Sequence, residues 1–80
     1  MSNDENFLEI KKIISKLLNL EIKELNIDSG KNNIRKWDSL NQVKIILEIE
    51  KKFNIKFGAD NFEDLDSIRK IINLIKEKTN

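Results

Sequence analysis

Eighty residues are enough for one domain, residues 1–80, with a modest hydrophobic core and a net stability of at most about 3–5 kcal/mol. The chain has no cysteine and no histidine, which excludes disulfides, a thiolate nucleophile, and the commonest general base and metal ligand. Its 15 basic and 14 acidic residues give a formal net charge of +1, which favours neither strong nucleic-acid binding nor an acidic tail.

The N-terminal residues and the apolar stretches predict the cellular location of the protein. The start, MSNDENF, is polar and acidic, unlike the cationic and then apolar start of a signal peptide. No apolar stretch approaches the roughly 18–20 residues that a membrane span needs. We therefore expect a soluble, cytoplasmic protein without a membrane span.

The scarcity of helix breakers predicts an all-α fold. There is no proline, and the only glycines are Gly30 and Gly58, which separate long stretches with a period of 3.6 residues. A first helix is predicted to start after Asn3 or Asp4 and to end near Asn19 or Leu20. Its inward face would consist of Phe7, Ile10, Ile14, Leu17 and Leu18.

Residues 20–37 read as a long connection between two helices. The sequence Asp28-Ser29-Gly30 is a turn signal. Long loops in compact domains are usually functional or disordered, and the apolar residues of this loop favour a functional role. We expect the loop to be pinned on the core by Leu25, Ile27, Ile34 and Trp37.

A second helix is predicted from residue 38 or 39 to residue 53. Its apolar residues cover more of the circumference than the face of an ordinary surface helix does. The helix must therefore pack on two sides or wall a pocket, and the pattern leaves both alternatives open. A single polar stripe would contain Asn41, Lys44, Glu48, Lys51 and Lys52.

The remaining residues predict a short helix and a final one. Residues 59–65 suffice for one or two helical turns, and Asp66 or Ser67 can cap the last helix. Ile68, Ile71, Ile72 and Ile75 would form its inward stripe. The predicted fold is an all-α bundle of three main helices plus one short helix, with a long loop between helices one and two.

No enzyme signature is present. The sequence lacks a glycine-rich phosphate loop, HExxH, GxSxG and a cysteine pair, and its carboxylates fall on segments that read as solvated faces. We therefore predict that the protein is not an enzyme and has no metal site. Any covalent chemistry would need a reactive group supplied from outside.

Three serines follow an aspartate. Ser29 precedes Gly30 and reads as part of a turn, whereas Ser39 and Ser67 both open amphipathic helices. Aspartate and serine are favoured there as caps, and a helix start also stabilises a phosphate. Local physics leaves both serines as candidates for phosphate attachment, and a plain N-cap is the better interpretation of each taken alone.

The residues around Ser39 separate the two candidates. Asp38-Ser39-Leu40 opens the second helix, and Val43, Ile46, Ile49-Glu50, Phe53, Ile55 and Phe57 follow in order. This combination resembles the acyl carrier protein family, in which Asp-Ser-Leu opens a second helix that ends in phenylalanine. The resemblance extends over nearly the whole chain, including the long loop, a short third helix and the last helix.

The resemblance implies a carrier function. Ser39 would receive phosphopantetheine from coenzyme A through a phosphopantetheinyl transferase, and the thiol of this arm would carry acyl or aminoacyl groups as thioesters. Asp38 would contact the transferase or cap the helix, and Leu40 would lie at the partner-facing start of the helix. Val43, Ile46, Ile49, Phe57, Leu65 and Ile71 match family positions near an acyl pocket, with core packing as their other role.

The chain departs from the family at two places. Trp37 stands before the motif, where fatty-acid synthesis carriers often have a glycine-containing segment. Family members commonly have an acidic second helix, but here Lys44, Lys51 and Lys52 line the exposed stripe, and Glu48 is spaced to pair with Lys44 and Lys52. We expect Trp37, Lys44 and Lys51 on the partner surface. Such a surface predicts partners other than the usual fatty-acid enzymes. The Trp-Asp-Ser-Leu form resembles a specialised carrier that serves polyketide, peptide-like or surface-glycan acylation rather than primary fatty-acid synthesis.

Two other functions are compatible with parts of the sequence. A nucleic-acid-binding module could use the basic residues, but a helix-turn-helix unit joins its helices by about three or four residues, and the first connection here is long. A plain protein-interaction domain could use Trp37 and Phe62 as anchors. Neither rival predicts phosphopantetheinylation. We expect a monomer, because the pattern leaves no large apolar stripe unpaired, with acyl-loading and acyltransferase or synthase enzymes as partners.

Overall fold

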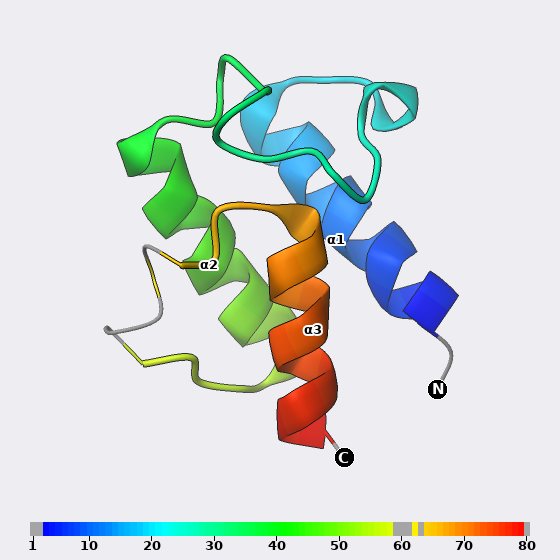
Figure 1. The fold of residues 1–80 in the computed structure, drawn as a ribbon, viewed down its shortest axis with the longest axis vertical. Coiled ribbons are helices and arrows are strands. Elements are labelled where there is room, and N and C mark those ends of the chain that lie inside the picture. The colour runs from blue at the N-terminus through cyan, green and yellow to red at the C-terminus, as the bar shows by residue number, and fades with distance from the viewer. Residues whose placement is uncertain (1–2, 59–61, 63, 80) are drawn as a thin grey trace.

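Three α-helices and a short 3-10 helix form the regular structure of the described residues. The computed structural model describes residues 3–58, 62 and 64–79. These contain α1 (Asn3–Leu18), the short 3-10 helix η1 (Ile22–Glu24), α2 (Ser39–Phe53) and α3 (Ile68–Thr79), as Figure 1 shows. The described residues include no β-strand, only an isolated bridge between Gly30 and Ser67. The prediction of an all-α fold with a long loop after the first helix is confirmed.

The helix boundaries follow from local chemistry. α1 ends where Asn19 adopts a left-handed conformation with φ 56°, and the Leu20 N–H bonds the Ser15 carbonyl at 2.9 Å. α2 ends in the same way at Asn54, whose φ is 55° and whose N–H bonds the Glu50 carbonyl. Asparagine is among the few residues other than glycine that tolerate this conformation, which explains why both helices end at an asparagine. The C-terminal ends of α1 and α2 lie within two residues of the predicted ones.

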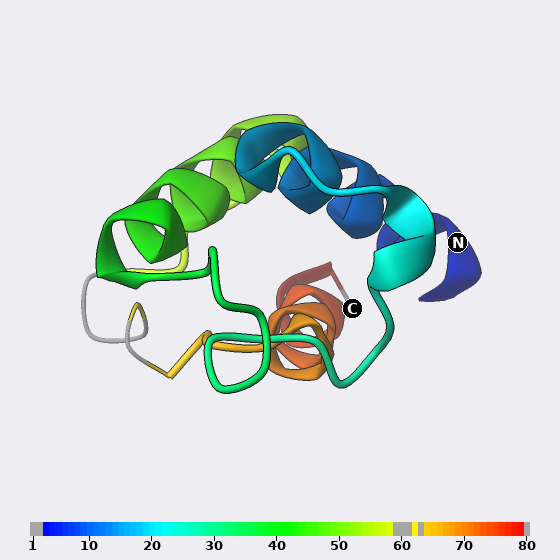
Figure 2. The same cartoon turned by 90° about the horizontal axis from the view of Figure 1, so that it is seen from above.

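The three helices enclose one hydrophobic core. Seen from above, α1 and α2 lie on one side of the molecule and α3 on the other, viewed nearly along its axis (Figure 2). On each helix, isoleucines that fall on its inward face are fully buried between these sides. They are Ile10 and Ile14 of α1, Ile45, Ile46 and Ile49 of α2, and Ile68, Ile71 and Ile75 of α3.

The long loop is pinned to the core, as predicted. Leu25 and Trp37 are buried, and Ile27 and Ile34 pack against the core cluster. The backbone of the loop is also hydrogen-bonded to the start of α3. The Lys31 N–H donates to the Asp66 carbonyl at 2.8 Å, and the Ile68 N–H donates to the Ser29 carbonyl at 2.9 Å.

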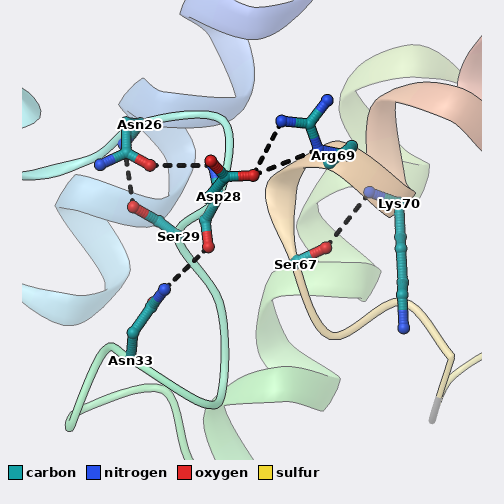
Figure 3. Close-up of polar contacts among 7 residues, drawn as sticks. All are labelled: Asn26, Asp28, Ser29, Asn33, Ser67, Arg69 and Lys70. Atoms are coloured by element: carbon teal, nitrogen blue, oxygen red, sulfur yellow. Dashed lines mark hydrogen bonds and ion pairs between the residues drawn. The ribbon is translucent and has the colours of Figure 1, made fainter.

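Side chains reinforce the attachment of the loop to α3 (Figure 3). The Arg69 guanidinium donates from Nε and Nη2 to Asp28 Oδ1, at 3.2 and 2.8 Å. Asn33 and Asn26 bond residues of the same turn, since Asn33 Nδ2 donates to the Asp28 carbonyl and the Asn26 N–H donates to Ser29 Oγ. The loop is therefore held on α3 by polar contacts as well as by apolar burial.

The segment before α3 bears on two predictions. The short helix predicted for residues 59–65 falls largely outside the described residues, and the two of them that are described before Leu65, Phe62 and Asp64, lie in turns. Of the two candidate caps for the last helix, Ser67 takes the role, because its Oγ accepts the Lys70 N–H at 3.3 Å.

None of the helices within the described residues combines the length and apolarity needed to cross a membrane.

Candidate functional site

Ser39 is the first residue of α2 and is exposed at the open end of the helix. The preceding residue, Asp38, is the N-cap: its Oδ1 accepts the Asn41 N–H at 2.8 Å and its carbonyl accepts the Gln42 N–H at 2.8 Å. Of the two roles considered for Asp38, the structure thus supplies the cap. Because Asp38 caps α2, the Ser39 hydroxyl is not needed for capping.

The serines of the other two Asp-Ser pairs are less exposed than Ser39, and their hydroxyls are used in a turn or a cap. The Ser29 side chain is buried, and its Oγ accepts the Asn26 N–H at 2.8 Å. Ser67 is half-buried, caps α3 with its own Oγ and forms a backbone bridge with Gly30. Ser39 is therefore the exposed serine of the three, and its hydroxyl is the one that takes no part in a cap or a turn.

A lysine from the long loop lies beside Ser39. Lys31 Nζ donates a hydrogen bond to Ser39 Oγ at 3.1 Å across eight positions of sequence. Sequence reasoning missed this contact, because it depends on the path of the loop and not on any periodic spacing. Lys36, which is nearer in sequence, points its Nζ to the Asn19 carbonyl at 3.5 Å instead.

Trp37 does not lie on the surface, so the prediction that it faces a partner is wrong. Its side chain is only 1% exposed. The indole can be buried because its Nε1 donates a hydrogen bond to Gln42 Oε1. Gln42, also buried, donates from Nε2 to the carbonyls of Phe62 and Leu65 at 2.7 and 2.5 Å. The sequence showed Gln42 only as an interruption of an apolar face.

Val43 departs from the prediction that it lies near an acyl pocket. It is 39% exposed and falls on the same face of α2 as Leu40 and Leu47, which are 66% and 52% exposed. These three residues form an exposed apolar stripe beginning next to Ser39, contrary to the expectation that no such stripe is left over. The other predicted pocket residues are buried in the core: Ile46, Ile49, Phe57, Leu65 and Ile71.

The three lysines of α2 that were expected on its exposed face differ in their contacts. Lys44 and Lys51 are exposed. Lys52 forms an ion pair with Glu9 of α1, with Nζ 3.5 Å from Oε2, rather than the expected pair with Glu48. The exposed face of α2 thus combines apolar side chains with the two lysines and the exposed carboxylate of Glu48, which lies between them along the helix.

Comparison with known proteins decides the family. The family model described as "Phosphopantetheine attachment site" matches residues 8–75. An acyl carrier protein of Buchnera aphidicola subsp. Schizaphis graminum is 35% identical over 78 residues, covering 98% of this chain and 96% of that protein. The chain belongs to the acyl carrier protein family. Acyl carrier proteins of Petrotoga mobilis and Guillardia theta are each 28% identical, over 80 and 78 residues, covering 100% and 98% of this chain and 94% and 96% of those proteins.

Membership of the acyl carrier protein family establishes the general role. The protein is an acyl carrier that works through phosphopantetheine, is not itself an enzyme, and interacts with synthase and transferase enzymes. The start of α2 fits the phosphate of such a group: it offers an exposed hydroxyl, the ammonium of Lys31 and the free N–H groups of a helix start. When bound, the group supplies the thiol that this chain lacks.

Proposed function

We propose that residues 1–80 form a single carrier domain in which Ser39 bears the phosphopantetheine arm. The observation that carries the proposal is the exposure of Ser39 at a helix start already capped by Asp38. A transferase would join Ser39 Oγ to the pantetheine-side phosphorus of the coenzyme A pyrophosphate. The bond from that phosphorus to the bridging oxygen would break, releasing adenosine 3′,5′-bisphosphate and the hydroxyl proton. The bound thiol would then hold acyl or aminoacyl groups as thioesters.

The interior of the bundle is the proposed shelter for an acyl chain. Ile46 and Ile49 of α2 and Ile71 of α3 belong to one core cluster with Phe57 and Leu65. An acyl chain entering there would replace contacts between these side chains with contacts to its own methylenes, at little loss of apolar burial. The same residues stabilise the fold when the carrier holds no chain.

The exposed face of α2 is the proposed partner surface. It consists of Leu40, Val43 and Leu47 flanked by Lys44 and Lys51, and it begins beside Ser39. A surface hollow lined by Leu47, Lys51, Ile55 and neighbouring residues continues it toward the C-terminal end of α2. Partners would include a phosphopantetheinyl transferase, an acyl- or aminoacyl-loading enzyme and an acyltransferase or synthase, with acidic groups around an apolar contact.

The exposed lysines Lys44 and Lys51, on a helix that is commonly acidic in the family, support partners other than the usual fatty-acid enzymes. On this ground we infer a specialised pathway of polyketide, peptide-like or surface-glycan acylation. We propose that the protein acts in such a pathway as a monomer whose apolar stripe binds partner enzymes transiently. A cytoplasmic location stays a prediction from the sequence.

Attachment is tested by intact mass and peptide mapping after incubation with coenzyme A and a broad-specificity phosphopantetheinyl transferase. We expect a mass gain matching phosphopantetheine that is lost in Ser39→Ala and kept in Ser67→Ala. Ser67→Ala is the matched control, because that serine also follows an aspartate at a helix start. A gain that persists in folded Ser39→Ala, or no gain in the folded wild type with several transferases, would overturn the assignment of Ser39.

A further inference from the structure

The contact between Lys31 and Ser39 joins the long loop to the proposed attachment point. Lys31 Nζ lies 3.1 Å from Ser39 Oγ, and both residues are exposed. No cap or core contact of the fold requires this hydrogen bond, since Asp38 caps α2. The ammonium is therefore available to a group attached at that oxygen.

The backbone from which the Lys31 side chain extends is held in place. The Lys31 N–H donates to the Asp66 carbonyl at 2.8 Å, and the adjacent Gly30 forms the bridge with Ser67. The Gly30 N–H donates to Asn33 Oδ1 at 2.8 Å, and the Ile34 N–H donates to the Gly30 carbonyl at 2.8 Å. Lys31 thus projects from an anchored turn toward the start of α2.

A phosphodiester at Ser39 would carry a negative charge, with its free oxygens two bonds from Oγ. An ammonium already within hydrogen-bond distance of Oγ can reach these oxygens by a small side-chain rotation, and charged hydrogen bonds of this kind are shorter and stronger than neutral ones. Lysine binds phosphate as a compact point charge, and the positive end of the α2 dipole adds to the attraction. At an exposed site this attraction is weakened by salt.

We propose that Lys31 binds the phosphodiester of the arm and orients its first bonds over the turn that precedes α2. This inference rests on the proposed attachment at Ser39. It assigns to the long loop a direct function in positioning the prosthetic group. Lys36 has no such role, because its ammonium contacts the Asn19 carbonyl.

The test uses phosphorus NMR on the modified protein, after intact mass has shown the arm on Ser39. We expect Lys31→Gln to shift the phosphodiester resonance and to lower its transverse relaxation rate toward that of free phosphopantetheine. Lys31→Arg should restore much of the wild-type behaviour, and Lys36→Gln, the matched control, should change neither quantity. The wild-type resonance should also move with added salt more than that of Lys31→Gln.

A second measurement needs no variant. Converting the wild type from the unmodified to the modified form should shift the ε-methylene signals of Lys31 and leave those of Lys36 in place. A phosphorus resonance indifferent to Lys31→Gln, or Lys31 signals that do not respond to modification, would overturn the inference while the mass gain still supported attachment. Absence of any mass gain at Ser39 would overturn both.

Discussion

The indole N–H of Trp37 donates a hydrogen bond to the side-chain carbonyl of Gln42, and both side chains are buried. The amide nitrogen of the same glutamine donates to the carbonyls of Phe62 and Leu65. One buried side chain thus joins the end of the long loop, the first turns of α2 and the segment before α3. Its polar atoms are all used, which makes removal of any one partner costly.

Replacing this glutamine should destabilise the fold markedly. Gln42→Leu keeps much of the volume but leaves the Trp37 N–H and two carbonyls without their partner, and an orphaned buried group costs about 1–3 kcal/mol. That is a large share of the total stability of about 3–5 kcal/mol expected for a domain of this size. Urea denaturation followed by circular dichroism measures the change. A loss below about 0.5 kcal/mol, the range of exposed substitutions such as the control Lys44→Ala, would contradict this role.

The pair can also be tested by a double-mutant cycle. Trp37→Phe removes the N–H donor while keeping an aromatic ring in the core. If the hydrogen bond carries the effect, Trp37→Phe and Gln42→Leu should be non-additive, with a coupling free energy of about 0.5–3 kcal/mol. Two losses that simply add would show that packing, and not the hydrogen bond, dominates.

Gly30 is expected to tolerate no side chain. A Cβ at this position would lie 2.2 Å from the Asp66 carbonyl oxygen and 2.9 Å from the Ser67 Cα, both backbone atoms. Gly30→Ala must therefore push the loop off the start of α3, and overpacking of this kind costs about 1–3 kcal/mol. The control is Asn32→Ala in the same turn, an exposed position. Equal unfolding midpoints of the two variants in urea would show that the loop yields freely there.

The sequence predicted the parts of this fold that depend on repeated spacing. The isoleucines at helical intervals placed the three helices, and their buried faces agree with the pattern. Trp37 was misplaced because an aromatic residue beside a helix start can face either way, and the acceptor that allows its burial, Gln42, becomes evident only in three dimensions. Lys31 was missed for a related reason, since its contact with Ser39 depends on how the loop is attached to α3.

The capping and attachment roles at the start of α2 should separate by mutation. Asp38→Ala removes the acceptor for the Asn41 N–H and should cost about 0.5–2 kcal/mol of stability, whereas Asp38→Asn should keep most of it. Ser39→Ala should change stability little, because that hydroxyl is exposed and is not the cap. Thermal unfolding of the unmodified variants measures this order. Equal losses in Asp38→Ala and Ser39→Ala would show that both side chains serve the cap.

The exposed stripe of α2 should be needed for partner binding and not for folding. Leu47 is 52% exposed and lies two turns from Ser39, so Leu47→Ala does not touch the reacting hydroxyl. Burying a leucine against a partner is worth about 1.5–3 kcal/mol, so its loss should lower the kcat/KM of the transferase on this carrier by about tenfold or more, chiefly through KM.

The matched control for Leu47→Ala is Leu8→Ala, which removes a leucine of 43% exposure from α1. This variant should be modified at the wild-type rate. Lys44→Glu should instead change the dependence of the rate on salt, because exposed charges act mainly on association. If Leu8→Ala and Leu47→Ala slowed modification equally, the effect would be one of general stability, and the partner surface would have to be sought on another face of the bundle.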